Sequence, residues 1–153
     1  MIVLAGAGLA ALLILDAVRR RRGDSPLPAT ASGPLSSPRD ADPLSKSANE
    51  WELYAARLAE ARNYREAVRA WYHAVLVTLY RGGALHYRQG RTNWEYYYSL
   101  PQRVTWRSQF LDVIQRFEIE WYGKSSSNAD DLADYSRRAG ALIAELREGK
   151  TQL

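Results

Sequence analysis

Residues 47–83 read SANEWELYAARLAEARNYREAVRAWYHAVLVTLYRGG, and this segment indicates the architecture of the folded part. It opens with Ser47-Ala-Asn-Glu50, a serine three residues before a glutamate, which is the capping-box pattern that begins helices. Asn63-Tyr-Arg-Glu66 repeats the pattern. We therefore expect one helix from Ser47 to about Arg62 and a second from Asn63 onward. Gly82 and Gly83 end the second helix, because glycine readily adopts the left-handed conformation found after helix C-termini.

Apolar side chains recur along both helices at helical spacing. One face of the first helix carries Ala55, Leu58, Ala59 and Arg62, and the second has a stripe of Ala67, Val68, Trp71, Val75, Leu76 and Leu79. The pair from Trp51 to Tyr80 resembles one tetratricopeptide unit, with small residues where the helices cross. A single unit cannot bury its own faces and no second copy follows, so the likeness indicates only the geometry of a helix pair.

Three more helices are predicted downstream. Thr92-Asn-Trp-Glu95 is a third capping-box pattern, opening a short helix that Pro101 ends, and Pro101 suits the start of the next helix. The next two apolar stripes are Phe110, Ile114, Phe117 and Trp121 (ending at Gly123), and Leu132, Tyr135, Ala139, Leu142, Ile143 and Leu146. No segment alternates with period two over any length. The prediction is an all-α fold, a bundle of about five helices over residues 47–147 with a tail at 148–153.

The N-terminus predicts a membrane anchor. Residues 1–18 are apolar or small except for Asp16, and a helix of that length spans about 27 Å, close to the thickness of a hydrocarbon core. The run ends at Arg19, Arg20, Arg21 and Arg22, and such residues beside a spanning helix stay in the cytoplasm. A signal peptide would need basic residues before the apolar run. We therefore expect one transmembrane helix over residues 1–18 and a cytoplasmic C-terminal domain.

Residues 19–46 comprise the basic stop and a Pro/Ser/Ala-rich segment. Five of the six prolines fall in it and none of the 17 aromatic residues does, so it cannot bury enough apolar surface to become ordered. The segment predicts a flexible linker. All aromatic residues lie between Trp51 and Tyr135, which places the folded domain after the linker.

Composition excludes several kinds of chemistry. A chain of 153 residues without cysteine has no disulfides, cysteine-ligated metal or thiol nucleophile. His73 and His86 belong to no metal-ligand motif, and no phosphate-binding or serine-hydrolase motif occurs, so we expect no metal and no cofactor. The net charge of +4 equals the charge of the four arginines after residue 18. The rest is neutral, which argues against nucleic-acid binding.

The aromatic run Trp94, Tyr96, Tyr97 and Tyr98 is the first candidate site. Its rings surround most of one short helix, so they cannot all enter the same core. Two interpretations remain open: some rings pack inward and the rest lie on the surface, or the cluster is a partner-binding patch, since Tyr, Trp and Arg are enriched at interface hot spots. Arg88, Arg91 and Arg103 lie nearby in the sequence.

Carboxylates are the second candidate. Glu95, Glu118 and Glu120 could supply a hydrolase with an acid–base pair. Glu95, however, occupies a capping position, and Glu118 and Glu120 lie on different sides of one helix. We therefore favour structural roles and expect no enzymatic activity.

Three strings of residues resemble a known family. They are A-x-x-L-A-E-A-x-x-Y-R-E-A-V-R-A-x-Y from Ala55 to Tyr72, R-T-N-x-E-Y from Arg91 to Tyr96, and F-E-x-x-W-Y-G from Phe117 to Gly123. Together they resemble the uncharacterised helical domain at the cytoplasmic C-terminus of bacterial membrane-bound transglutaminase-like proteins (domain of unknown function 4129). The resemblance covers roughly residues 47–146, and the transglutaminase core is absent.

This resemblance implies an accessory role at the bacterial inner membrane, where family members often occur beside a MoxR-type AAA+ ATPase. It implies no reaction. The candidate family positions are Arg91, Thr92, Glu95, Tyr96, Glu118, Trp121, Tyr122 and Gly123. Glu95 and Glu118 near Arg91 and Tyr122 are expected to form a polar cluster that locks two helices together.

The sequence thus predicts a single-pass membrane protein whose cytoplasmic domain binds another protein without catalysis. The partner would be a AAA+ ATPase or a transglutaminase-like membrane protein. Two alternatives remain: a structural subunit of a larger membrane complex, and a carboxylate-dependent hydrolase using Glu95 and Glu118.

Overall fold

The computed structural model describes residues 42–149. The predicted transmembrane helix, the four arginines that follow it, the linker up to residue 41 and residues 150–153 lie outside the described residues. Within residues 42–149, no helix has both the length and the apolar character needed to cross a bilayer.

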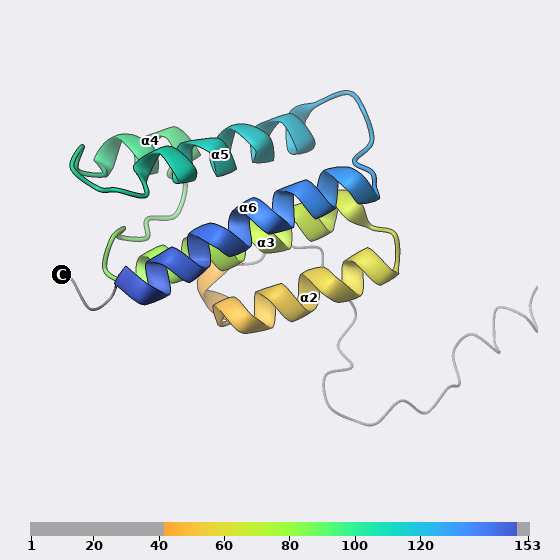
Figure 1. Cartoon of the computed structure of the whole chain (residues 1–153), viewed down its shortest axis with the longest axis horizontal. Helices are drawn as coiled ribbons and strands as arrows, with labels where there is room; N and C mark the ends of the chain where they lie inside the picture. Colours follow the sequence, from red (N-terminus) through yellow and green to blue (C-terminus); the bar gives the residue numbers. More distant parts are fainter. Residues whose placement is uncertain (1–41, 150–153) are drawn as a thin grey trace, which may run out of the picture. The chain divides into compact units, whose positions relative to one another are not determined.

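Five α-helices form the described part of the chain (Figure 1). They are α2 (Ala48–Glu60), α3 (Tyr64–Arg81), α4 (Asn93–Ser99), α5 (Arg107–Tyr122) and α6 (Ala129–Glu148), preceded by the short 3-10 helix η2 (Pro43–Ser45). Residues 42–149 contain no strand. The predictions of an all-α fold and of about five helices are confirmed.

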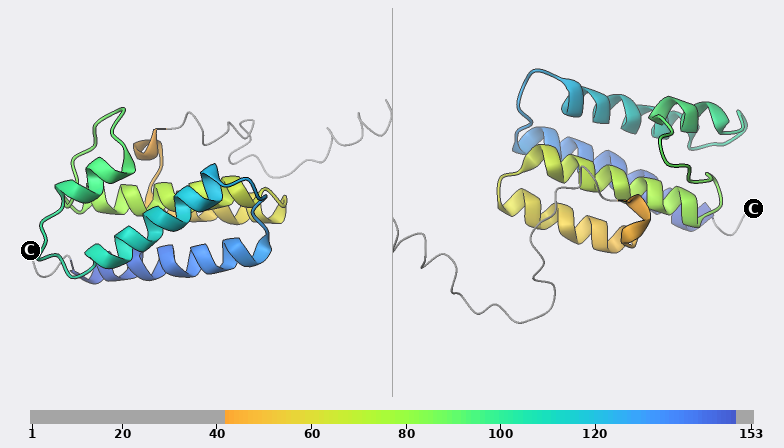
Figure 2. Two further views of the ribbon diagram at one scale, coloured as in Figure 1. Left: turned by 90° about the horizontal axis from the view of Figure 1, so that it is seen from above. Right: turned by 180° about the vertical axis from the view of Figure 1, so that it is seen from behind.

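Helix α3 lies at the centre of the bundle. It contacts α2, α5, α6 and η2, and α4 packs against α5 (Figures 1 and 2). Its buried residues lie on every side of the helix along much of its length. One side carries the predicted stripe of Val68, Val75, Leu76 and Leu79 together with Tyr72, and other sides carry Ala70, Ala74 and Val77. A helical segment whose buried residues lie on every side must be covered all round. This requirement explains why the other helices are arranged about it.

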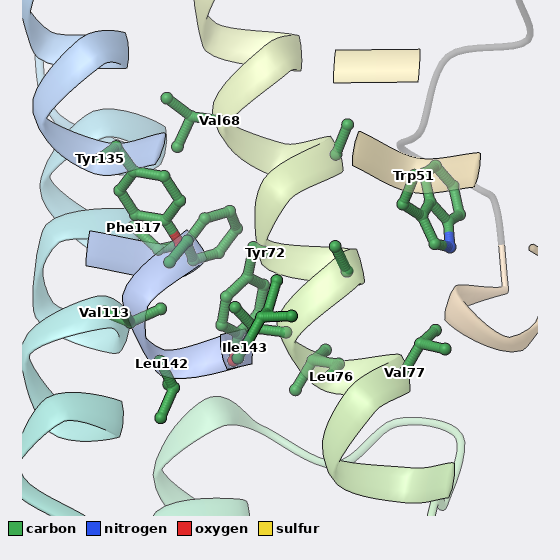
Figure 3. Close-up of a cluster of buried hydrophobic side chains, with 14 of the residues drawn as sticks. Trp51, Val68, Tyr72, Leu76, Val77, Val113, Phe117, Tyr135, Leu142 and Ile143 are labelled. Carbon is green, nitrogen blue, oxygen red and sulfur yellow. The ribbon is translucent and has the colours of Figure 1, made fainter. Parts of the chain in front are cut away.

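The core contains side chains from all five α-helices, and Figure 3 shows part of it. Phe117 of α5 stacks on Tyr72 of α3, with ring centroids 4.3 Å apart and planes 15° apart. Tyr135, Leu142 and Ile143 of α6 are almost fully buried. Removing this much apolar surface from water is the main stabilising term for the bundle.

Two of the three predicted capping boxes form as expected. The Ser47 hydroxyl accepts from the Glu50 amide at 3.2 Å, and the Glu50 carboxylate accepts from the Ser47 amide at 2.7 Å. Thr92 and Glu95 make the same pair of bonds at the start of α4. Asn128 and Asp131 form a further box that begins α6, which sequence reasoning missed because the acid there is aspartate.

The capping box predicted at Asn63 is wrong, since its side chain makes no cap hydrogen bond. The chain reverses so tightly between α2 and α3 that Arg62 takes a left-handed conformation, with φ of 60°. The Asn63 amide then donates to the Leu58 carbonyl at 2.8 Å. The N-terminus of α3 is therefore set by this turn. At the other end of α3, the predicted left-handed glycine is present at Gly83, with φ of 76°.

Two predicted boundaries also differ. Pro101 does not begin the next helix: the chain makes two turns, with amide-to-carbonyl bonds from Val104 to Pro101 and from Arg107 to Val104, before α5 starts. The predicted linker ended at residue 46, but residues 42–46 are folded. The Trp51 indole donates to the Pro43 carbonyl at 2.8 Å, and the Lys46 ammonium lies over the Trp51 ring.

His73 is buried on α3, whereas His86 is exposed. The His73 ring meets Trp51 edge to face at 4.6 Å, and its Nδ1 has no hydrogen-bond partner among the described residues. Burial, and secondarily the charge of Arg69, lower the pKa of His73 to about 4. The folded state therefore contains a neutral imidazole.

This burial predicts a loss of stability in mild acid. Because the pKa of His73 is lower when folded (about 4) than when unfolded (6.5), falling pH protonates the unfolded chain first. The free energy of unfolding should drop by about 2 kcal/mol from pH 7 to pH 5, measured by urea denaturation. His73→Phe should flatten this dependence, and His86→Gln should keep it. An equal slope in the wild type and in His73→Phe would contradict the assignment.

Candidate functional site

Helix α4 is seven residues long and is held in place by two tyrosines. Tyr96 is only 3% exposed, and its hydroxyl donates to the Arg88 carbonyl at 2.9 Å and accepts from the Arg88 amide at 3.2 Å. From the central helix, the buried Tyr72 hydroxyl donates to Asn93 Oδ1 at 2.7 Å. Helices this short are not stable alone, so these contacts fix α4 in position.

The remaining rings of α4 form a cluster that extends from the core to the surface. Trp94, Tyr97 and Tyr98 contact one another with centroid separations of 5.5–6.2 Å. Trp94 and Tyr97 are half-buried, and Tyr98 is 71% exposed. The aromatic run is thus divided, with Tyr96 in the core and Tyr98 on the surface.

A single hydrogen bond between side chains joins α4 to α5 in the described residues. The Trp94 indole N–H donates to Glu118 Oε2 at 3.2 Å. One helical turn beyond Glu118, Tyr122 is 75% exposed, and the neighbouring Ile119 is 57% exposed. We call the surface made by Trp94, Tyr97, Tyr98, Glu118, Ile119 and Tyr122 the α4–α5 face.

Three arginines stack on rings in and around this face. The Arg107 guanidinium lies 4.3 Å from the Tyr97 ring centroid, Arg91 lies 5.6 Å from Tyr96, and Arg69 lies 3.8 Å from Trp121. Such cation–π contacts stabilise both groups. Sequence reasoning singled out Arg91 but missed the other two. Arg69 is far along the chain from Trp121, and Arg107 lies in a different helix from Tyr97.

Trp121, Tyr122 and Gly123, the last three residues of the third family string, have separate roles. Trp121 is parallel to Phe117 at 6.2 Å and packs against Arg69, so it belongs to the contact between α3 and α5. Gly123 ends α5 where a Cβ would stand 2.2 Å from the Ile119 carbonyl oxygen, and Arg65 donates to the carbonyls of Gly123 and Ser125. Only Tyr122 of the three projects into solvent. Two of these three residues, Trp121 and Gly123, therefore have structural roles.

The two candidate carboxylates do not form the expected polar cluster. Glu95 is occupied by its capping box, and hydrogen bonds from Thr92 lower the pKa of this exposed carboxyl. Glu118 bonds Trp94. Arg91 lies over Tyr96, and within residues 42–149 neither Arg91 nor Tyr122 pairs with Glu95 or Glu118. The link that joins the two helices runs through the indole rather than through charges.

Two surface cavities of the described residues lie away from these carboxylates. The larger, of about 440 Å³, is lined mainly by alanines of α2 and α6 with Tyr64 and Trp71 of α3. The second, of about 300 Å³, lies between α5 and α6. No group of three or more potential metal ligands occurs in the part of the chain that the structure describes.

Comparisons of the chain with family models, with curated proteins and with solved structures find no match. The family resemblance therefore remains a proposal based on the three sequence strings.

Gly123 gives the sharpest test of this geometry. Gly123→Ala should lower the free energy of unfolding by about 1–3 kcal/mol, because the added methyl meets backbone at the Ile119 carbonyl. Gly149→Ala is the matched control, since Gly149 also follows a helix but a Cβ added there would have nothing within 4 Å. Equal effects in thermal or urea unfolding would contradict the close approach.

Proposed function

We propose that the chain is a membrane-anchored accessory protein whose helical domain binds another protein through the α4–α5 face and performs no catalysis itself. The observation that carries this proposal is that α4 and α5 hold most of the large hydrophobic side chains that are exposed among residues 42–149. Five large hydrophobic residues are exposed in residues 42–149, and three of them, Tyr98, Ile119 and Tyr122, belong to this face. Exposed tyrosines beside a fixed aromatic cluster are typical of interaction sites.

The state of these rings also favours binding. Trp94 and Tyr97 are fixed by Glu118 and Arg107, so a partner would lose little conformational freedom of the face on docking. Tyrosine and tryptophan provide large contact areas with few rotatable bonds, which is why they dominate interface hot spots. The face is therefore preorganised.

The membrane location is supported by sequence alone. The apolar run of residues 1–18 followed by four arginines is typical of an anchor with a cytoplasmic C-terminal domain. The resemblance to the domain of transglutaminase-like membrane proteins favours a partner at the inner membrane, such as a MoxR-type ATPase or a transglutaminase-like protein. A permanent subunit of a larger membrane complex would use the same face.

Site-specific crosslinking in native membranes tests the proposal. A photoreactive phenylalanine analogue at position 98 or 122 of the full chain should crosslink the same protein from either position. The analogue at Leu53, which is 61% exposed on α2, should not capture that protein. Tyr122→Ala should reduce the crosslink from position 98 at least about fivefold, the loss expected for one hot-spot side chain.

Equal capture of that protein from Leu53, or no common partner for positions 98 and 122, would contradict an interface at this face. Leu53→Ala serves as the matched substitution, and it should leave the crosslink unchanged. Both alanine variants should retain the wild-type melting temperature within a few degrees, because these side chains are largely exposed.

A further inference from the structure

The chemistry of the α4–α5 face identifies the group that a partner presents to it. We propose that Trp94, Tyr98 and Glu118 together receive an arginine side chain of the bound protein. This inference rests on the proposed function, and it goes further by naming what is recognised.

The first argument is the state of the Glu118 carboxylate. This side chain is half-buried between α4 and α5, where Oε2 accepts from the Trp94 indole. Within residues 42–149, Glu118 forms no ion pair, and no donor reaches Oε1. By contrast, Asp112 on the same helix and Asp134 on α6 are both paired with arginine. A partly desolvated carboxylate without a counter-charge favours a cation at its free oxygen.

The second argument is the pattern of stacked arginines. Tyr96, Tyr97 and Trp121 each have an arginine of this chain over the ring. Among the described residues, no cation lies over Trp94 or Tyr98, although their rings adjoin Tyr97. The ring pair beside the unpaired carboxylate is thus the one that still lacks a guanidinium.

Geometry favours arginine over other cations. Trp94 and Tyr98 are 6.2 Å apart and tilted by 31°, and most of Tyr98 is open to solvent. A planar guanidinium can stack on an aromatic ring and at the same time donate N–H groups in its own plane to a carboxylate oxygen. Ile119 and Tyr122 then supply the apolar surroundings against which the rest of the partner segment packs.

The test uses the full chain, labelled with ¹⁵N, and the indole N–H signal of Trp94, assigned with Trp94→Phe. The probe is Nα-acetyl-arginine amide, and its neutral isostere Nα-acetyl-citrulline amide is the matched ligand. The arginine probe should shift the Trp94 signal saturably and bind at least about fivefold more tightly than the citrulline probe, as expected for a combined cation–π and charge contact.

Glu118→Gln should remove this preference while keeping an oxygen that accepts from the indole, so the helix contact survives. Glu120→Gln is the control, because residue 120 lies on a different side of α5, and it should leave the preference intact. Equal binding of the two probes, or an unchanged preference in Glu118→Gln, would overturn the inference.

Failure of this inference is distinguishable from failure of the proposed function. If the crosslink from position 98 is lost in Tyr122→Ala but unaffected by Glu118→Gln, the face binds its partner without an arginine, and only the further inference falls. If the crosslink weakens at least about fivefold in Glu118→Gln and not in Glu120→Gln, both stand.

Discussion

The requirement that α3 be covered on every side governs this structure. Between Ala70 and Leu79 its buried residues lie on every side, and α2, α5, α6 and η2 each cover a share of its surface. Apolar burial is not directional, and it alone would allow several arrangements. Directional interactions specify the arrangement. They are the stacking of Tyr72 on Phe117, the hydrogen bond from the Trp51 indole to Pro43, and the arginines that bind backbone or carboxylates of other elements.

The candidate site is a consequence of that packing. Helix α4 is too short to contribute more than one turn to the core, and it uses Tyr96 for this purpose. Once Tyr96 faces inward, a helix of consecutive aromatic residues must turn Tyr98 outward. The Tyr72–Asn93 bond then connects α3 to the first residue of α4, next to Trp94. The core contact and the candidate site therefore lie on two sides of the same seven residues.

Local features of the fold could be predicted from the sequence, and tertiary ones could not. Ser47–Glu50 and Thr92–Glu95 form their capping boxes because the interactions lie within one turn. Asn63 fails as a cap because the tight reversal at Arg62 sets its backbone. For the site, sequence reasoning found Trp94 and Glu118 separately, but they are 24 residues apart and no local pattern pairs them. Arg69 was missed because a helical arginine is expected to face solvent, and only the tertiary structure shows that it packs on Trp121.

We expect the contacts of α3 with α4 to hold α4 rigid and so to present the α4–α5 face. Hydrogen–deuterium exchange of the full chain, comparing wild type with Tyr72→Phe, tests it most directly. Loss of the bond to Asn93 should speed exchange of the amides of α4 at least several-fold, while α2 and α6 keep their protection. If α4 exchanges as freely as the loop at residues 101–106 already in the wild type, or if its protection is unchanged in Tyr72→Phe, the core does not hold the face in place and the account is contradicted.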